Sequence, residues 1–197
     1  MRQVSSRPCE AFFDSIPSFA AWWQRMIPTE KSNLVLIGMP GSGKSTIGVI
    51  LAKRSSHDFV DTDVVIQTRV QRSLQDILDQ EGYLRLREIE AAVLQDLHVR
   101  NHVISTGGSA VYSDAAMRHL KHDGICIYLD VSLDTLRSRI TDYETRGIAK
   151  RPDQSFDDLF TERTRLYRQY ADITVNGDGK NQDTVCNEII AGLAQSR

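Results

Sequence analysis

Short apolar runs alternate along the chain with longer stretches in which apolar residues recur at helical spacing. The runs predict strands, and these are Leu34–Ile37, Phe59–Val60, Val103–Ser105, Ile125–Leu129 and Ile173–Val175. The stretches between them predict helices, and these are Ser45–Arg54, Val64–Thr68, Ser73–Gln80, Tyr83–Val99, Ser113–Leu120, Ser132–Ile140, Ser155–Tyr170 and Asp183–Ala194. Such an alternation predicts an α/β fold, a parallel sheet sandwiched between helices.

Two segments lie outside this alternation. Residues 1–32 precede the first strand and form a candidate extension of the main domain, residues 33–197. Their apolar residues fall at helical spacing, interrupted by Pro17. We expect one short docked helix there, and a helix that binds a partner or a second copy is the alternative. Residues Asp142–Gln154 are polar and contain glycine and proline, which predicts a mobile loop that supplies little of the core.

Composition narrows the class of protein. The chain has 197 residues, 41% of them hydrophobic, and a formal net charge of −2, values typical of a globular domain without a basic surface for nucleic acid. No apolar run approaches the roughly 20 residues that span a bilayer. Three scattered cysteines give neither a disulfide framework nor a zinc pattern. We therefore expect a cytoplasmic protein, as a monomer or weak homodimer, with no membrane or nucleic-acid partner.

The first strand leads into a phosphate-binding motif. Residues Gly38–Thr46 read GMPGSGKST, which fits the pattern G-x-x-x-x-G-K-[ST] between a strand and a helix. In this motif the glycines let backbone N–H groups point at phosphate oxygens, and the following helix adds its positive end. Lys44 would reach the β- and γ-phosphates, and the Ser45 hydroxyl would ligate Mg²⁺. The residues expected to contact a nucleoside triphosphate here are Gly41, Ser42, Gly43, Lys44, Ser45 and Thr46.

Two further motifs follow predicted strands. Asp61-Thr62-Asp63 follows the second strand, and Thr106-Gly107-Gly108 follows the third. Ligands of parallel sheets bind at the carboxyl ends of the strands, so both motifs should converge with the phosphate loop on one crevice. One aspartate there would hold Mg²⁺ through water, and the other would take the proton of an acceptor hydroxyl. The alternative is a polar turn in which Thr62 or Asp63 caps a helix.

Arginines supply the remaining candidate chemistry. Arg87 and Arg163 lie on predicted helices, and a guanidinium fork matches a planar carboxylate. In the polar loop, Arg146 and Arg151 are candidates to close over the triphosphate and exclude water. Taken singly, an arginine on a helix is most often a solvated surface residue.

In their order along the chain, these motifs resemble the shikimate kinase family. The resemblance rests on Gly38–Thr46, Asp61-Thr62-Asp63, Arg87 with Glu90, Thr106-Gly107-Gly108, and Glu162-Arg163 before Leu166-Tyr167, and it covers about residues 33–176. It implies a nucleoside-monophosphate-kinase-like P-loop fold, a three-layer α-β-α sandwich with a five-stranded parallel sheet and a lid at about residues 142–154. The activity implied is ATP-dependent phosphorylation of the 3-hydroxyl of shikimate, a step of aromatic amino-acid biosynthesis.

The resemblance also implies roles for individual residues. Asp63 would bind the acceptor hydroxyls and act as the base, while Asp61 would hold Mg²⁺ through water alongside Ser45. The carboxylate of the acceptor would lie between Arg87 and Arg163. The other implied contacts are Gly107 and Gly108 with the acceptor, Arg139 with the adenine, and Arg146, as the lid arginine, with ATP.

Several positions depart from the family pattern. Ser109 stands where a third glycine is usual, and two aromatic positions that pack on the acceptor ring correspond to Leu78 and Leu86. The usual Arg-Pro-Leu-Leu of the lid reads Arg-Gly-Ile-Ala at residues 146–149, with Arg151-Pro152 as a competing match. A same-fold kinase for another small hydroxy or amino acid, such as homoserine or gluconate, is therefore an alternative. A nucleotide-binding protein without catalysis is a second one.

Overall fold

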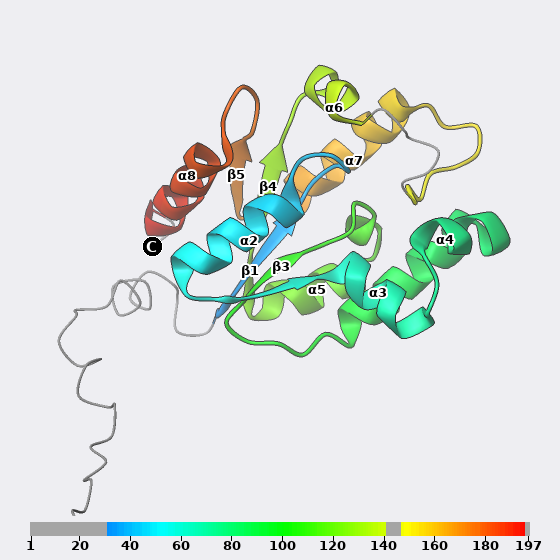
Figure 1. Ribbon diagram of the computed structural model, residues 1–197, viewed down its shortest axis with the longest axis horizontal. Coiled ribbons are helices and arrows are strands. Elements are labelled where there is room, and N and C mark those ends of the chain that lie inside the picture. The colour runs from blue at the N-terminus through cyan, green and yellow to red at the C-terminus, as the bar shows by residue number, and fades with distance from the viewer. Residues whose placement is uncertain (1–30, 141–146, 196–197) are drawn as a thin grey trace, which may run out of the picture.

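A five-stranded parallel sheet forms the centre of the protein (Figure 1). The computed structural model describes residues 31–140 and 147–195, so the predicted N-terminal helix and Arg146 lie outside the described residues. The strands are β1 (Asn33–Ile37), β2 (Asp58–Asp61), β3 (His102–Ser105), β4 (Gly124–Asp130) and β5 (Ile173–Asn176). Their spatial order is β2-β3-β1-β4-β5, with every neighbouring pair parallel. The predicted five-stranded parallel sheet is therefore confirmed.

Helices cover both faces of this sheet, as the predicted sandwich requires (Figure 1). They are α2 (Lys44–Ser55), α3 (Thr62–Val70), α4 (Leu74–Gln95), α5 (Asp114–His122), α6 (Leu133–Arg139), α7 (Phe156–Tyr170) and α8 (Gln182–Gln195), with a 3₁₀ turn η2 (Ala110–Tyr112). Ser113 and Ser132 accept hydrogen bonds from backbone N–H groups at the starts of α5 and α6, so both predicted caps are confirmed.

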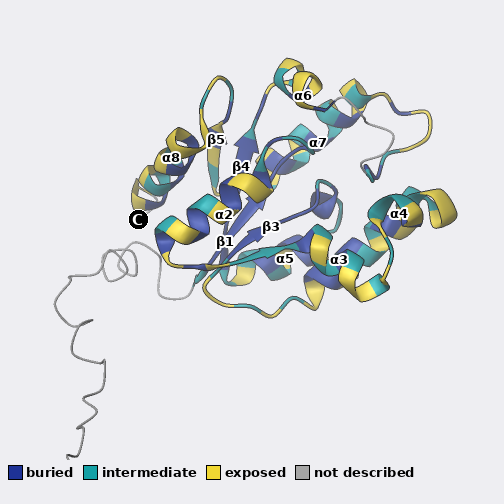
Figure 2. Ribbon diagram, in the orientation of Figure 1, coloured by how far each residue is buried: buried dark blue, intermediate teal, exposed yellow. Residues whose placement is uncertain are grey.

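The central strand β1 serves two separate cores. Leu34 and Leu36 pack with residues of α2 and α8, whereas Val35 and Ile37 pack with residues of α4, α5 and α7. This division follows from the two-residue period of a strand, whose successive side chains point to opposite faces. Because both faces are covered, all of β1 is buried, and β1 and its two neighbours, β3 and β4, are dark blue over most of their length in Figure 2.

The structure corrects three expectations about the elements. The break predicted between helices Ser73–Gln80 and Tyr83–Val99 is present, because α4 is kinked at the non-helical Gly82 (φ 82°), but its second part ends at Gln95 and not at Val99. The turn η2 was not predicted. The loop after α6 buries both Ile148 and Ala149, so the expectation that this segment supplies little of the core is wrong for them.

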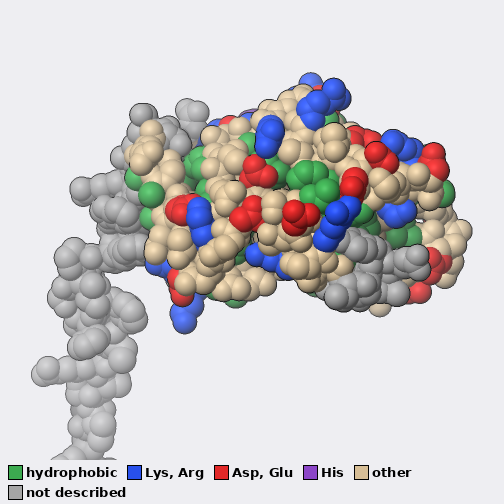
Figure 3. Space-filling model, turned by 90° about the horizontal axis from the view of Figure 1, so that it is seen from above, with side chains coloured by type: hydrophobic (Ala, Val, Ile, Leu, Met, Phe, Trp, Pro, Cys, Tyr) green, Lys and Arg blue, Asp and Glu red, His purple; other side chains and the backbone are tan. Residues whose placement is uncertain are grey.

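The carboxyl ends of the strands form the face on which the predicted motifs meet. Seen from above, acidic and basic side chains lie interspersed there around apolar ones (Figure 3). A third apolar cluster, which includes Ile66, Ile77 and Leu86, joins α3 to α4 beside the sheet.

Across the described residues, we find no helix with the length and apolar character that a membrane crossing requires.

Candidate active site

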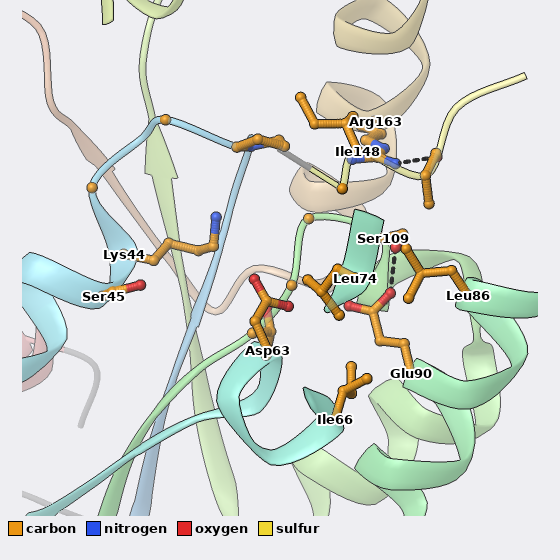
Figure 4. Close-up of a pocket in the computed structure, with 18 of the residues that line it drawn as sticks. Lys44, Ser45, Asp63, Ile66, Leu74, Leu86, Glu90, Ser109, Ile148 and Arg163 are labelled. Atoms are coloured by element: carbon orange, nitrogen blue, oxygen red, sulfur yellow. Dashed lines mark hydrogen bonds between the residues drawn. The ribbon is translucent and has the colours of Figure 1, made fainter. Parts of the chain in front are cut away.

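A cavity of about 510 Å³ opens where the phosphate loop faces α3, α4 and the turn after β3. Lys44 and Ser45 project into it from the start of α2, and Asp63, Leu86 and Glu90 lie across from them (Figure 4). Of the predicted site residues, those lining the cavity are Gly41, Gly43, Lys44, Ser45, Thr46, Asp63, Gly107, Gly108, Arg139 and Arg163. The predicted convergence of three motifs on one crevice is therefore what the fold produces.

The phosphate loop adopts a conformation that glycine allows. Gly41 and Gly43 have φ values of 80° and 95°, a region that other L-residues rarely adopt. The Lys44 Nζ lies beneath the loop and donates to the carbonyl oxygens of Gly38 and Met39, both at 2.9 Å. Its side chain is buried, and burial lowers the pKa of Lys44 to about 8, although the nearby Asp63 and Asp61 act in the opposite direction. A buried ammonium of this kind is suited to a polyanionic ligand.

The start of α2 presents two exposed hydroxyls to the cavity, those of Ser45 and Thr46. The Ser45 Oγ lies 3.4 Å from the Oγ of Ser105 at the end of β3, a neighbour that the sequence motifs did not indicate. Ser42, in contrast, is buried within the loop. Hydroxyl and carboxylate oxygens are the ligands that Mg²⁺ prefers.

A second cavity adjoins the phosphate loop on its other side. Arg139 lies between the two cavities, and its Nη1 is 3.5 Å from the carbonyl oxygen of Gly41. Leu129 of β4 and the chain after β5, including Gly177, Lys180 and Val185, form further walls, and none of these residues was predicted to be part of the site. The two cavities together give an extended ligand a path across the loop.

The two aspartates of the Asp61-Thr62-Asp63 motif have different surroundings. Asp61 ends β2 and caps α3, because its Oδ1 accepts the backbone N–H of Asp63 at 3.0 Å. The capping residue of α3 is therefore Asp61, and neither Thr62 nor Asp63 has the capping role considered for it. Asp63 lines the cavity, and burial together with the charge of Asp61 raises its pKa, while Lys44 acts in the opposite direction. A carboxylate with a raised pKa is a better proton acceptor.

Glu90 is an acidic residue of the cavity to which sequence reasoning gave no role. It is 2% exposed and accepts a hydrogen bond from the Ser109 hydroxyl through its Oε2 (Figure 4). Burial raises its pKa to about 7, and the charge of Asp63 adds to this. Helical spacing could have placed it, because it follows Leu86 by four residues and therefore shares its face of α4.

The two glycines after β3 leave space for this acidic pair and for an arginine. A Cβ at Gly107 would collide with the Glu90 Oε1 and lie 2.8 Å from the Asp63 Oδ1. One at Gly108 would lie 2.9 Å from the Arg163 Nη1. These contacts are shorter than a carbon atom tolerates, so the close approach requires glycine.

The two predicted carboxylate-binding arginines meet at one carbonyl oxygen. Arg163, 1% exposed on α7, donates from Nη2 to the Ala149 oxygen at 2.7 Å, and Arg87 on α4 donates from Nη2 to the same oxygen at 3.1 Å. Arg163 is among the residues that line the main cavity, and Arg87 is not. Arg151, the competing lid arginine, forms an ion pair with Glu162 at 3.1 Å.

Apolar side chains complete the wall between these polar groups. Leu86 lines the cavity as the family resemblance implies, but Leu78 lies in a separate depression beside Tyr83. Ile66, Leu74 and Ile148 take part in its place (Figure 4).

Comparison with known proteins identifies the family. A family model described as shikimate kinase matches residues 40–194. The chain belongs to the shikimate kinase family. Shikimate kinase of Sulfurihydrogenibium sp. is 35% identical over 162 residues, which are 82% of this chain and 97% of that protein. That of Haemophilus influenzae is 36% identical over 165 residues, which are 82% of this chain and 92% of that protein.

Solved structures agree with this assignment. Shikimate kinase from Acinetobacter baumannii in complex with shikimate has a TM-score of 0.78 and 26% identity, covering 85% of this chain and 95% of that one. Shikimate kinase from Aquifex aeolicus has a TM-score of 0.71 and 34% identity, covering 82% and 95%. The resemblance and the P-loop kinase fold are thus confirmed, and the protein is an ATP-dependent kinase.

Proposed function

We propose that this member of the shikimate kinase family transfers the γ-phosphoryl group of ATP to the 3-hydroxyl of shikimate. The observation that carries this proposal is the cavity itself, in which a buried lysine under a phosphate loop faces a carboxylate and a buried arginine. Shikimate offers hydroxyls to the carboxylate of Asp63 and a carboxylate to Arg163. A solved relative holds shikimate, which supports this choice of acceptor over homoserine or gluconate.

In the nucleotide half, ATP lies along the phosphate loop. Backbone N–H groups of residues 41–46 bind the phosphates, and Lys44 neutralises charge on the β- and γ-phosphates. Arg139 lies against the adenine, at the border with the second cavity. The Ser45 hydroxyl and the Asp61 carboxylate would hold Mg²⁺, Asp61 through water, since only one Asp61 carboxylate oxygen caps α3. When bound, Mg²⁺ neutralises phosphate charge.

In the acceptor half, Asp63 acts as the general base. The 3-hydroxyl oxygen attacks the γ-phosphorus. The bond between the γ-phosphorus and the β,γ-bridging oxygen breaks, and ADP leaves with that oxygen. Asp63 hydrogen-bonds the attacking hydroxyl and takes its proton, which its raised pKa favours. Arg163 and Arg87 bind the carboxylate of shikimate, and Gly107 and Gly108 line its ring.

Replacing Gly107 by alanine tests this placement. The added Cβ would displace the carboxylates of Glu90 and Asp63, so we expect the KM for shikimate to rise by about tenfold and the KM for ATP to stay within about twofold. Gly192→Ala on α8, remote from the cavity, is the matched control. A larger effect on ATP than on shikimate would place Gly107 in the nucleotide half.

The lid arginine gives a second prediction. Arg146→Ala should lower kcat more than Arg151→Ala, because Arg151 is engaged by Glu162 at the protein surface, whereas the family resemblance assigns Arg146 to the triphosphate. The expected difference is about 10²-fold, the low end for one preorganised group that stabilises the transition state. Steady-state rates at saturating ATP and shikimate measure it. The reverse order would make Arg151 the lid arginine.

The activity is tested by coupled ADP release with Mg·ATP. Shikimate is compared with homoserine, gluconate and other small hydroxy acids, and phosphorus–proton NMR of the product shows which hydroxyl carries phosphate. Saturable turnover with shikimate and phosphate on the 3-hydroxyl supports the proposal. Turnover only with another acid would show that the protein is a kinase with a different acceptor. ATP binding without any turnover would indicate a non-catalytic protein.

We also infer that the enzyme acts in the cytoplasm as a monomer or weak homodimer. Both cysteines of the described part, Cys126 and Cys186, are buried free thiols, as a reducing compartment allows. That residues 1–32 form one docked helix remains a prediction.

A further inference from the structure

One aromatic ring faces both arginines of the acceptor half. Tyr112, the last residue of η2, follows the turn that carries Gly107 and Gly108. Its ring centroid lies 3.6 Å from the Arg87 Cζ and 5.4 Å from the Arg163 Cζ. A guanidinium over an aromatic face is attracted by the negative face of the ring, and the attraction grows when water is excluded. The ring therefore offsets part of the repulsion between two neighbouring cations.

The hydroxyl of the same residue reaches α7. The Tyr112 OH donates to the Glu162 Oε1 at 2.6 Å, and Glu162 immediately precedes Arg163. The second oxygen of Glu162 accepts from the Gln154 Nε2 at 2.8 Å and pairs with Arg151 at 3.1 Å. Tyr112 thus connects the helix of Arg87 with the helix of Arg163 and, through Glu162, with Arg151 and Gln154 at the end of the predicted lid segment.

The arginines keep donors that no described residue accepts. The Nε atoms of Arg87 and Arg163 are buried and have no hydrogen-bond partner among residues 31–140 and 147–195. Both side chains share the single Ala149 carbonyl through Nη2. A buried charged donor without a partner is costly, so this pair is built to receive a further acceptor group. A carboxylate, with two oxygens and a negative charge, meets that need.

We propose that Tyr112 is a positioning residue for recognition of the acceptor carboxylate. Its ring supports the Arg87 guanidinium, and its hydroxyl, through Glu162, fixes the turn of α7 that carries Arg163. Without the ring, the two cations would separate and lose their common orientation toward the carboxylate. This role rests on the proposed function, because it takes the pair as the site of the shikimate carboxylate.

The test compares Tyr112→Leu with Tyr112→Phe. The leucine variant loses the ring, and we expect the KM for shikimate to rise by about tenfold, with kcat within about threefold and the KM for ATP within about twofold. The phenylalanine variant keeps the ring and loses the hydroxyl, which bonds Glu162 and also interacts with Arg163, so its KM should rise by about threefold or less. Tyr170→Leu, which removes an aromatic side chain whose hydroxyl bonds Asp114 outside the cavity, is the control.

A double-mutant cycle separates positioning from general packing. If Tyr112 acts through Arg87, Tyr112→Leu should add little to the KM change caused by Arg87→Met alone. Independent, multiplying effects would overturn the proposal, as would an equal rise in the KM values for ATP and shikimate. Should Tyr112→Leu fail to fold, Tyr112→Gln carries the same expectations.

The wild-type enzyme distinguishes failure of this proposal from failure of the proposed function. If it turns over another carboxylate-bearing acid and not shikimate, the assigned substrate is wrong, and the same variants are compared with that acid. A selective rise in the KM for that acid would still support the role of Tyr112. An unchanged KM in Tyr112→Leu would overturn it with either substrate.

Discussion

Lys44→Ala is expected to lower kcat by about 10²–10³-fold, the loss typical of removing one preorganised group that stabilises transition-state charge. The Nζ is held under the phosphate loop by the carbonyl oxygens of Gly38 and Met39, so its position is set before ATP arrives. Such preorganisation makes the charge effective, because no reorientation is needed as negative charge develops on the γ-phosphoryl group. Steady-state kinetics at saturating shikimate and varied Mg·ATP measure the change.

Thermal unfolding checks that the fall in kcat of Lys44→Ala reflects a missing catalytic group and not a destabilised protein. Burial lowers the pKa of Lys44 to about 8, which means that the ammonium is costly to bury in the protein without ATP. Its removal should therefore leave Tm unchanged or raise it. Lys53→Ala, at an exposed position in the last turn of the same helix, is the matched control and should retain wild-type kcat. A Lys44→Ala enzyme with near wild-type kcat would exclude the assigned role.

Asp63→Asn is expected to lower kcat by about 10²–10⁴-fold, the range for general acid–base groups, while ATP binds with its affinity nearly unchanged. The amide keeps the size of the side chain and loses its negative charge and its capacity to take the proton of the acceptor. Single-turnover phosphoryl transfer measures the first effect, and calorimetric titration with ATP measures the second.

The control for this variant lies on the same strand–helix unit. Asp58→Asn, at the exposed start of β2, also removes one negative charge and should leave turnover unaffected. If Asp63→Asn kept the wild-type rate, the base would have to be another group of the cavity, and Glu90 is the nearest acidic candidate.

Local patterns predicted the nucleotide half better than the acceptor half. The strand, loop and helix around Lys44 are consecutive in the chain, so one motif defines their geometry. Likewise, Asp63 and Gly107 were placed by their positions after strands, because parallel strands end at the same edge of a sheet. These expectations needed only the order of the elements.

The acceptor half depends on contacts between residues far apart in the sequence. Nothing local to Ala149 indicates that its carbonyl would lie between two arginines, and nothing local to Tyr112 predicts stacking on Arg87 from another helix. Leu78 was placed by correspondence with the family, but it lies in a depression separate from the main cavity. Side-chain packing between separate elements determines such positions, and a periodic pattern does not contain that information.

The central place of β1 has a consequence for how the protein is made. The strand that carries the phosphate loop leaves the ribosome first among the strands, but its two neighbours, β3 and β4, end at Ser105 and Asp130. Parallel neighbours so distant along the chain pair late, because long loops must close before their contacts form. A growing chain therefore carries its complete ATP-binding motif through most of synthesis without the supporting sheet. Nucleotide therefore has no complete site to bind in the early stages of folding, and the apolar side chains of β1 lack their partners on β4 until that strand emerges, a state in which growing chains are prone to aggregate.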